Sequence, residues 1–127
     1  MNKTKVVDEL NKRYPGKNIV LNDPDNPTEI ICEIETAKDN PDRGVAVAVI
    51  DTTIHHYHDL LEEVYEVERG SLVISIDGKQ TTLTPGQKIT IKPGQVHSAE
   101  GHETWIKVTS CPAWTPNDQY SVASKQQ

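Results

Sequence analysis

Residues 55–70 read HHYHDLLEEVYEVERG, and this stretch concentrates side chains that can hold a metal ion. His56 and His58 are separated by one residue. Side chains at positions i and i+2 of an extended strand project from the same face, so the two imidazoles can converge on one ion. His55 has the opposite parity and is expected to point away from that face.

A carboxylate follows the histidine pair in the segment EVYEVE, residues 63–68. The segment alternates along the chain, and Glu63, Tyr65 and Val67 fall on one side of it. Because only this side carries bulky apolar or aromatic residues behind a carboxylate, Glu63 is predicted to point inward with the histidines. Glu62 is the competing carboxylate if the strand begins later than this pattern indicates.

A third histidine lies downstream, in the run KPGQVHSAEG of residues 92–101. His97 follows the Pro93-Gly94 turn, and a tight bend of this kind can aim the next strand back into the same interior. Three neutral imidazoles and one carboxylate are ligand types that divalent Mn, Fe, Co, Ni, Cu and Zn accept. The sequence therefore predicts one metal site that joins two distant parts of the chain.

These two stretches together resemble the two motifs of the cupin superfamily. The run His56-x-His58, four residues, Glu63, six residues and Gly70 is similar to the first motif in both internal spacings. Residues 86–97, which lead from a glycine through the Pro-Gly turn to the last histidine, resemble the second motif.

The match to the motifs has three departures. The usual Pro-x-Gly is here Lys92-Pro93-Gly94, and the Asn that the family often carries four residues after the last histidine is Gly101. The glycine usually found six residues before the first histidine is Ile50. All three departures fall outside the predicted ligands, so they concern the geometry of turns more than the binding of a metal.

The resemblance covers about residues 44–110 and implies an all-β fold, a cupin-like double-stranded β-helix or jelly-roll barrel. The chain pattern adds a short N-terminal helix. Residues 1–127 are expected to form one domain, with the helix and edge strands in 1–43 and a coil and tail in 111–127. The expected cofactor is one divalent transition metal ion, Fe, Mn, Ni or Zn. Its predicted ligands are His56, His58, Glu63 and His97.

Function within such a fold is set by the site, because one scaffold hosts many chemistries. The resemblance implies a range from dioxygenases, isomerases and decarboxylases to metabolite binders. Two hypotheses stay open: a metal-dependent oxygenase or isomerase acting on a small polar metabolite, and a non-catalytic module that binds or senses one. Tyr65 is the candidate catalytic residue, although an aromatic side chain that fills the barrel is an equal interpretation.

Composition and charge limit the number of domains, the partners and the compartment that we expect for this chain. The chain has 127 residues, 35% hydrophobic content and no Phe, which suits one domain with a core of Val, Ile and Leu. A net charge of -6 without a Lys/Arg cluster argues against nucleic acid. No stretch approaches a membrane span, the N-terminus lacks a signal-peptide pattern, and Cys32 and Cys111 fit buried thiols in a reducing compartment. A cytoplasmic protein is expected.

Local patterns predict the remaining elements. A short helix capped by Thr4 is expected to end at Pro15-Gly16. An Asp77-Gly78 connection between alternating runs indicates a hairpin. Beside the ligand strand, the expected strands are 18–21, 29–35, 45–50, 71–76, 79–84, 87–91 and 105–110.

The two ends of the chain carry weaker expectations. Residues 111–118 are expected to form a coil that wraps the barrel, and residues 120–127 a frayed tail. Many cupins form dimers by pairing or exchanging edge strands, so the resemblance implies a homodimer, and an exposed strand near the N-terminus would allow one.

Overall fold

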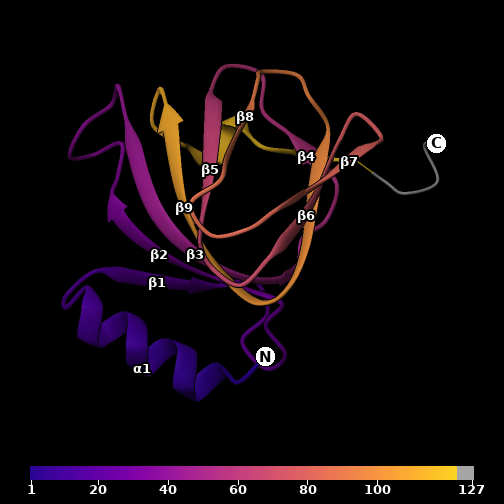
Figure 1. The fold of residues 1–127 in the computed structure, drawn as a ribbon. Coiled ribbons are helices and arrows are strands. Elements are labelled where there is room, and N and C mark those ends of the chain that lie inside the picture. The colour runs from indigo at the N-terminus through magenta and orange to yellow at the C-terminus, as the bar shows by residue number, and fades with distance from the viewer. Residues whose placement is uncertain (123–127) are drawn as a thin grey trace.

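The computed structural model describes residues 1–122, in which one α-helix precedes a curled antiparallel β-sheet (Figure 1). The helix is α1 (Lys3–Arg13), and a short 3-10 helix, η1 (Pro116–Asp118), lies near the C-terminus. The strands are β1 (Asn18–Leu21), β2 (Glu29–Glu35), β3 (Gly44–Thr52), β4 (His56–Tyr57), β5 (Glu62–Arg69), β6 (Leu72–Ile76), β7 (Lys79–Leu83), β8 (Lys88–Ile91), β9 (His97–Cys111) and β10 (Tyr120–Ser121). No helix within residues 1–122 has the length and apolar character that crossing a membrane requires.

Strand β9 organises the sheet, because its 15 residues pair in turn with β6, β4, β3 and β5. The main path runs β1-β2-β3-β9-β4-β10, while β8 pairs with β5 and β7 with β6. The sequence predicted a separate strand at 105–110, but β9 continues through residues 101–103. These residues bulge, since Ile50 pairs with Thr104 and Thr52 with Glu100. A bulge of this kind bends a strand, and the sheet curls into a half-barrel (Figure 1).

Two apolar clusters lie on opposite faces of this sheet. The inner cluster fills the barrel with Ala48, Ile50, Tyr65, Val67, Leu72, Ile74, Leu83, Ile91, Ala99 and Ile106. The outer cluster joins α1 to the convex face through Val6, Leu10, Ile30, Cys32, Val47, Val49 and Trp105. Alternate residues of β3 enter the two clusters, as the two-residue period of a strand requires. This explains why β3 is apolar on both faces.

The helix was predicted correctly, although its N-cap was not. Asn2, rather than Thr4, caps α1, because its side chain accepts a hydrogen bond from the Lys5 amide at 3.1 Å. The buried positions of the helix are Val6 and Leu10, one turn apart. The apolar stripe on α1 therefore follows the helical period that the sequence indicated.

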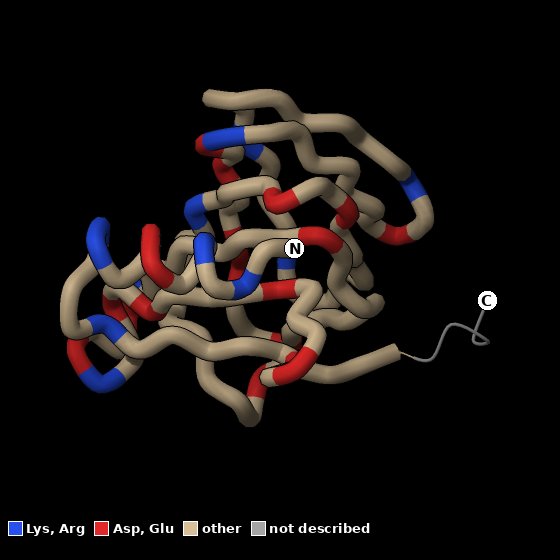
Figure 2. The backbone as a smooth tube through the Cα atoms, turned by 90° about the horizontal axis from the view of Figure 1, so that it is seen from below, with Lys and Arg blue, Asp and Glu red and all other residues tan. Residues whose placement is uncertain are grey.

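Charged side chains frame the contact between α1 and the sheet. Arg13 lies 3.9 Å from Glu9 and 3.6 Å from Glu68, and Arg69 lies 3.0 Å from Glu9. Figure 2 shows acidic and basic positions interleaved on the side of the molecule that carries the N-terminus. These pairs are partly exposed, so they fix the position of the helix more than they stabilise the fold.

The turn and strand predictions hold at most positions. The hairpin β6–β7 turns at Asp77 and Gly78, whose φ angles of 49° and 83° are the positive values that a tight two-residue connection requires. Strands β1 and β2 have the predicted bounds. Strand β1 lies at the end of the main sheet path, and pairing of two copies through it stays a prediction.

The C-terminal segment differs from the prediction. Part of the expected coil is the 3-10 helix η1, and Tyr120 and Ser121 of the expected frayed tail form β10, which pairs with β4. The rest of the predicted tail, residues 123–127, lies outside the described residues. Cys32 is buried as predicted, whereas Cys111 is exposed at the end of β9.

Candidate metal centre

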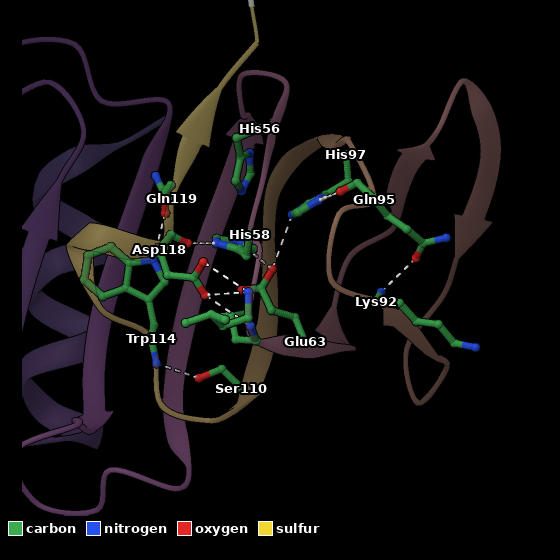
Figure 3. A network of polar contacts seen from close by, with 12 residues as sticks. His56, His58, Glu63, Lys92, Gln95, His97, Ser110, Trp114, Asp118 and Gln119 are labelled. Carbon is green, nitrogen blue, oxygen red and sulfur yellow. Dashed lines mark hydrogen bonds and ion pairs between the residues drawn. The ribbon is translucent and has the colours of Figure 1, made fainter.

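Four side chains from three parts of the chain meet at one point inside the barrel (Figure 3). His56 lies in β4, and His58 is the first residue after that strand. Glu63 lies in β5, and His97 begins β9. One nitrogen or oxygen from each lies within 4.8 Å of those from the other three. Glu63 and two of the histidines are buried, while His56 is partly exposed and gives the cluster its solvent-facing side.

The turn before β9 is built to place His97. Gly94 has a φ angle of 82° and donates its amide to the His58 carbonyl at 2.7 Å, which ties the two histidine segments together. The Gln95 side chain accepts the Lys92 amide at 2.8 Å and closes the turn. The displaced proline of the family motif therefore still allows His97 to reach the cluster.

Each histidine is held through the ring nitrogen that faces away from the cluster. The Nδ1 atoms of His56, His58 and His97 lie 2.9, 2.7 and 3.0 Å from the carbonyl oxygens of Ile54, Asp118 and Gln95, respectively. A carbonyl oxygen can only accept, so Nδ1 carries the proton in all three rings. In the neutral imidazole the Nε2 lone pair is then free, which is the tautomer that a metal-ligating histidine needs.

Three of the converging atoms have no hydrogen-bond partner among the described residues. They are Nε2 of His58, Nε2 of His97 and Oε1 of Glu63. The Glu63 oxygen lies 3.2 Å from the first nitrogen and 3.3 Å from the second. With neutral rings these contacts bring lone pairs together, which is unfavourable unless a cation lies between them. Ligand atoms about 2.1 Å from one ion lie about 3 to 4 Å apart, so the two distances from Glu63 fit a metal shared with His58 and His97.

The ionisation of the cluster suits ligation. Burial alone would raise the pKa of Glu63, but His58 and His97 outweigh it and lower that pKa to about 2. Burial, aided by His97, lowers the pKa of His56 to about 4. Burial also acts to lower the pKa of His58, yet the nearby Glu63 carboxylate raises it overall. A carboxylate and a neutral His56 are therefore available at neutral pH, whereas a proton at His58 competes with a metal ion.

Two further groups face the same interior. Tyr65 is buried, with its ring edge-on to His97 at 6.2 Å between centroids. Burial, with the carboxylates of Glu63 and Glu29, raises the pKa of Tyr65 well above its usual value. Burial, and then the charge of Glu63, raises the pKa of Glu29 to about 7.

Sequence reasoning missed Glu29, because residues 29–35 alternate apolar and acidic side chains like a strand with only one buried face. The available signal was Ile31, an apolar residue on the acidic face. Ile31 packs against the inner cluster, so the face that it shares with Glu29 is the one that looks into the barrel.

Sequence reasoning also missed Asp118. Its carbonyl oxygen is the partner of His58, and its carboxylate accepts the amides of Asp59, Leu60 and Leu61 at 2.7 to 3.2 Å. No local pattern could have found it, because the contacts join residues 57 to 60 positions apart.

The other two histidines, the competing carboxylate Glu62 and the neighbouring Tyr57 are not members of the cluster. His55, His102 and the competing carboxylate Glu62 are all exposed. Tyr57 stacks on Tyr120 with 5.1 Å between ring centroids. Two surface hollows of the described residues are lined by His102, and none of the four clustered residues lines either.

Comparison of the sequence gives a short match. No family model matches the chain. A curated relative, the epoxidase atD of Aspergillus terreus (strain NIH 2624 / FGSC A1156), is 42% identical over 43 residues. The match spans 33% of this chain and 13% of the relative, so the chain corresponds to a small part of that protein.

Comparison of the structure gives matches over most of the chain. Streptomyces Pac13, described as a unique nucleoside dehydratase, has a TM-score of 0.74 and 14% identity and covers 86% of this chain and 87% of its own. The polyketide cyclase RemF from Streptomyces resistomycificus has a TM-score of 0.67 and 18% identity, with coverage of 87% and 82%. KdgF from Halomonas sp. has a TM-score of 0.66 and 15% identity, with coverage of 76% and 89%.

At these identities the likeness shows the fold alone. The predicted architecture, a cupin-like β-barrel with an N-terminal helix, is confirmed. Its interior carries a His/Glu group whose spacing and unpaired atoms are consistent with metal binding.

Proposed function

We propose that this protein binds one divalent transition metal ion and uses it to act on a small polar metabolite. The proposed ligands are His56, His58, Glu63 and His97. The observation that carries the proposal is the set of three buried, unpaired ligand atoms that face one another. An apolar core has no reason to hold such atoms together, and a bound cation would compensate for their lost hydration.

The donor set limits the metal by class. Imidazole and carboxylate ligands suit Fe, Mn, Ni and Zn, and availability in the cell decides among metals of similar fit. When bound with four protein ligands, an ion of octahedral preference leaves coordination positions open and can polarise a carbonyl or hydroxyl group of a ligand. The remaining chemistry belongs to the protein side chains around it.

Glu29 favours an enzyme, either an oxygenase or an isomerase. Burial and the charge of Glu63 raise the pKa of Glu29 to about 7 in the metal-free protein. A cation at Glu63 would bring that pKa down toward its ordinary value, so Glu29 is proposed as a general base toward the bound metabolite. Tyr65, buried beside His97, is proposed to donate a hydrogen bond to the bound metabolite. Neighbours of this fold support a small ligand, since Pac13 has been solved with uridine and RemF is described as a polyketide cyclase.

A non-catalytic binding or sensing module is the second candidate. Tyr65 favours this binding module. Its pKa lies well above the usual value, so the phenol stays protonated and donates a hydrogen bond to a ligand rather than acting as a base. Oxygen or substrate turnover separates the two candidates.

The first test is metal analysis of protein purified without chelator or nickel affinity. About one metal ion per chain is expected. His56→Ala and His97→Ala should each lower the metal content, whereas His55→Ala and His102→Ala, at exposed positions, should not. A metal content that falls only in the second pair of variants would contradict the proposed site.

The second test measures turnover. Oxygen consumption is followed with the iron-loaded protein against thiols, diketones and catechols, and sugar isomerisation with each of the four metals. Turnover that needs the metal would support the enzyme. A protein that holds the metal and binds a metabolite without converting it would be the binding module.

A further inference from the structure

Asp118 makes an unusually complete set of contacts with the segment that follows His58. Its carboxylate accepts the Asp59 amide at 2.7 Å, the Leu60 amide at 3.2 Å through both oxygens, and the Leu61 amide at 3.1 Å. The residue is only 6% exposed. A buried carboxylate that accepts several amides fixes the backbone that donates them, so Asp118 fixes the turn through which His58 enters the barrel.

The backbone of Asp118 holds the histidine itself. Its carbonyl oxygen accepts Nδ1–H of His58 at 2.7 Å (Figure 3). This bond sets both the ring orientation and the tautomer that leaves Nε2 free. One residue therefore fixes His58 twice, through the turn behind it and through the ring.

Asp118 belongs to residues 113–122, which we name the C-terminal strap. The strap is fastened on both sides of Asp118. On one side the Trp114 amide donates to the Ser110 hydroxyl at 3.1 Å, and Ser110 pairs across the sheet with Glu63. On the other side, β10 pairs with β4 next to His56. The strap therefore connects β9, which pairs with β5 at Glu63, to β4, which carries His56.

We propose that Asp118 is a positioning residue for the metal centre, so that docking of the strap and binding of the metal favour each other. This inference rests on the proposed function, because it needs a metal at His58. A cation on Nε2 makes Nδ1–H a stronger donor and tightens the bond to the Asp118 carbonyl. By linkage, the docked strap strengthens metal binding by the same factor.

The test uses Co²⁺, whose visible spectrum reports the geometry of its ligands. Asp118→Ala keeps the carbonyl that holds His58 but removes the carboxylate that docks it, so Co²⁺ binding should weaken by about 10-fold, the low end of the effect of losing an outer partner. Asp118→Asn keeps one acceptor oxygen and should lie between wild type and Asp118→Ala. At saturating Co²⁺, the Asp118→Ala spectrum should differ from that of wild type, which a loss of stability alone would not cause.

A matched control is available in the loop before β2. The Asp23 carboxylate accepts the amides of Asp25 and Asn26 at 2.9 and 3.2 Å, and none of these groups touches the cluster. Asp23→Ala therefore removes loop hydrogen bonds of the same kind. Its Co²⁺ affinity should stay within about twofold of wild type.

Amide exchange in the wild-type protein tests the coupling without any substitution. Saturating Co²⁺ should slow exchange of the Leu60 and Leu61 amides at least about tenfold, because these amides open only when Asp118 leaves. The Lys5 amide, capped by Asn2 at the helix N-terminus, should change little.

The outcomes separate this inference from the proposed function. A wild-type chain that binds no Co²⁺ would overturn the metal centre and this inference with it. A wild type that binds Co²⁺ through the four residues, together with an Asp118→Ala variant of unchanged affinity and spectrum, would overturn the role of Asp118 alone. Unchanged exchange at Leu60 and Leu61 would do the same.

Discussion

Both faces of the sheet are buried, but among residues 1–122 the inner face buries a group of polar side chains beside its apolar cluster, and the outer face does not. On the outer face, Leu10 and Trp105 pack among apolar side chains with 0% and 2% of their surface exposed. On the inner face, His97 and Glu63 are buried to a similar degree, yet they hold unpaired polar atoms against each other. The apolar clusters on both faces stabilise the fold, whereas the His/Glu group of the inner face is a cost to the metal-free protein at a pH where the histidine rings are neutral.

The difference between the faces predicts that substitutions will separate stability from metal affinity. A variant of the His/Glu group on the inner face should lose metal and, at a pH where the rings are neutral, keep or gain stability. A variant of the outer cluster should lose stability and keep its metal affinity.

The largest effect is expected for Glu63→Gln. Loss of a charged ligand should weaken metal binding at least about 1000-fold, or about 4 kcal/mol, more than loss of an outer partner does. In the metal-free protein at pH 8, the amide N–H groups can donate to the unpaired Nε2 atoms of His58 and His97. The free energy of unfolding should therefore rise by about 1 kcal/mol.

Calorimetric metal titration and urea unfolding of the chelated protein measure the two quantities. Glu62→Gln is the matched control, since it changes the neighbouring but exposed carboxylate. It should leave both quantities near wild type. A Glu63→Gln variant that is clearly less stable without metal would mean that the contacts to the histidines are favourable ion pairs.

The next effect is expected for Leu10→Ala on the outer face. Leu10 is fully buried between α1 and the sheet, so its truncation should lower the free energy of unfolding by about 3 kcal/mol. Metal affinity of the folded variant should stay within about twofold of wild type. Val7→Ala, at a half-buried helix position, is the control and should cost clearly less. A large loss of metal affinity in Leu10→Ala would show that the faces are coupled.

The sequence was sufficient for the parts of the site that depend on local geometry. The spacing of His56 and His58 and the alternation around Glu63 follow from the two-residue period of a strand. The turn before His97 follows from Pro-Gly chemistry. Each of these rules acts over a few residues, so it can be applied without knowing the fold.

The parts that the sequence could not predict depend on contacts between distant residues. Asp118 acts on a segment 57 to 59 positions earlier, and an aspartate after a proline-rich coil resembles any surface turn. Glu29 was missed because β2 alternates apolar and acidic residues, which is the pattern of a strand with one buried face. α1 covers the apolar face, and Ile31 on the other face packs against the inner cluster, so Glu29 also looks into the barrel.

Glu29→Gln should give a smaller effect that depends on pH. The folded pKa of Glu29, about 7, lies above its ordinary value of 4.5, so between these values the folded chain holds a proton that the unfolded chain has lost. Stability of the metal-free wild type should therefore fall as pH rises from 4.5 to 8. Because Gln cannot ionise, the variant should be about 1 to 3 kcal/mol more stable than wild type at pH 8 and similar at pH 4.5.

Urea unfolding of both chelated proteins across this pH range measures the difference. Bound metal should reduce it, because a cation at Glu63 offsets the charge that opposes ionisation of Glu29. Glu35→Gln, which changes a more exposed carboxylate of the same strand, is the control and should leave the stability near that of wild type. An equal stability of wild type and Glu29→Gln at every pH would place the Glu29 carboxyl in water.

The smallest effect is expected for Arg69→Lys, which tests whether charge adds to the outer face. The Arg69 guanidinium lies 4.4 Å above the Trp105 ring and 3.0 Å from Glu9, but 56% of the side chain is exposed. Lysine keeps the charge and loses the planar stacking, so the free energy of unfolding should fall by only about 0.5 kcal/mol. Urea unfolding in 0.05 and about 1 M salt separates the contributions, because salt screens the ion pair with Glu9 more than the contact with the ring. A loss above about 2 kcal/mol would mean that ion pairs contribute strongly to the outer face. The outer face and the His/Glu group would then no longer differ as apolar and polar burial.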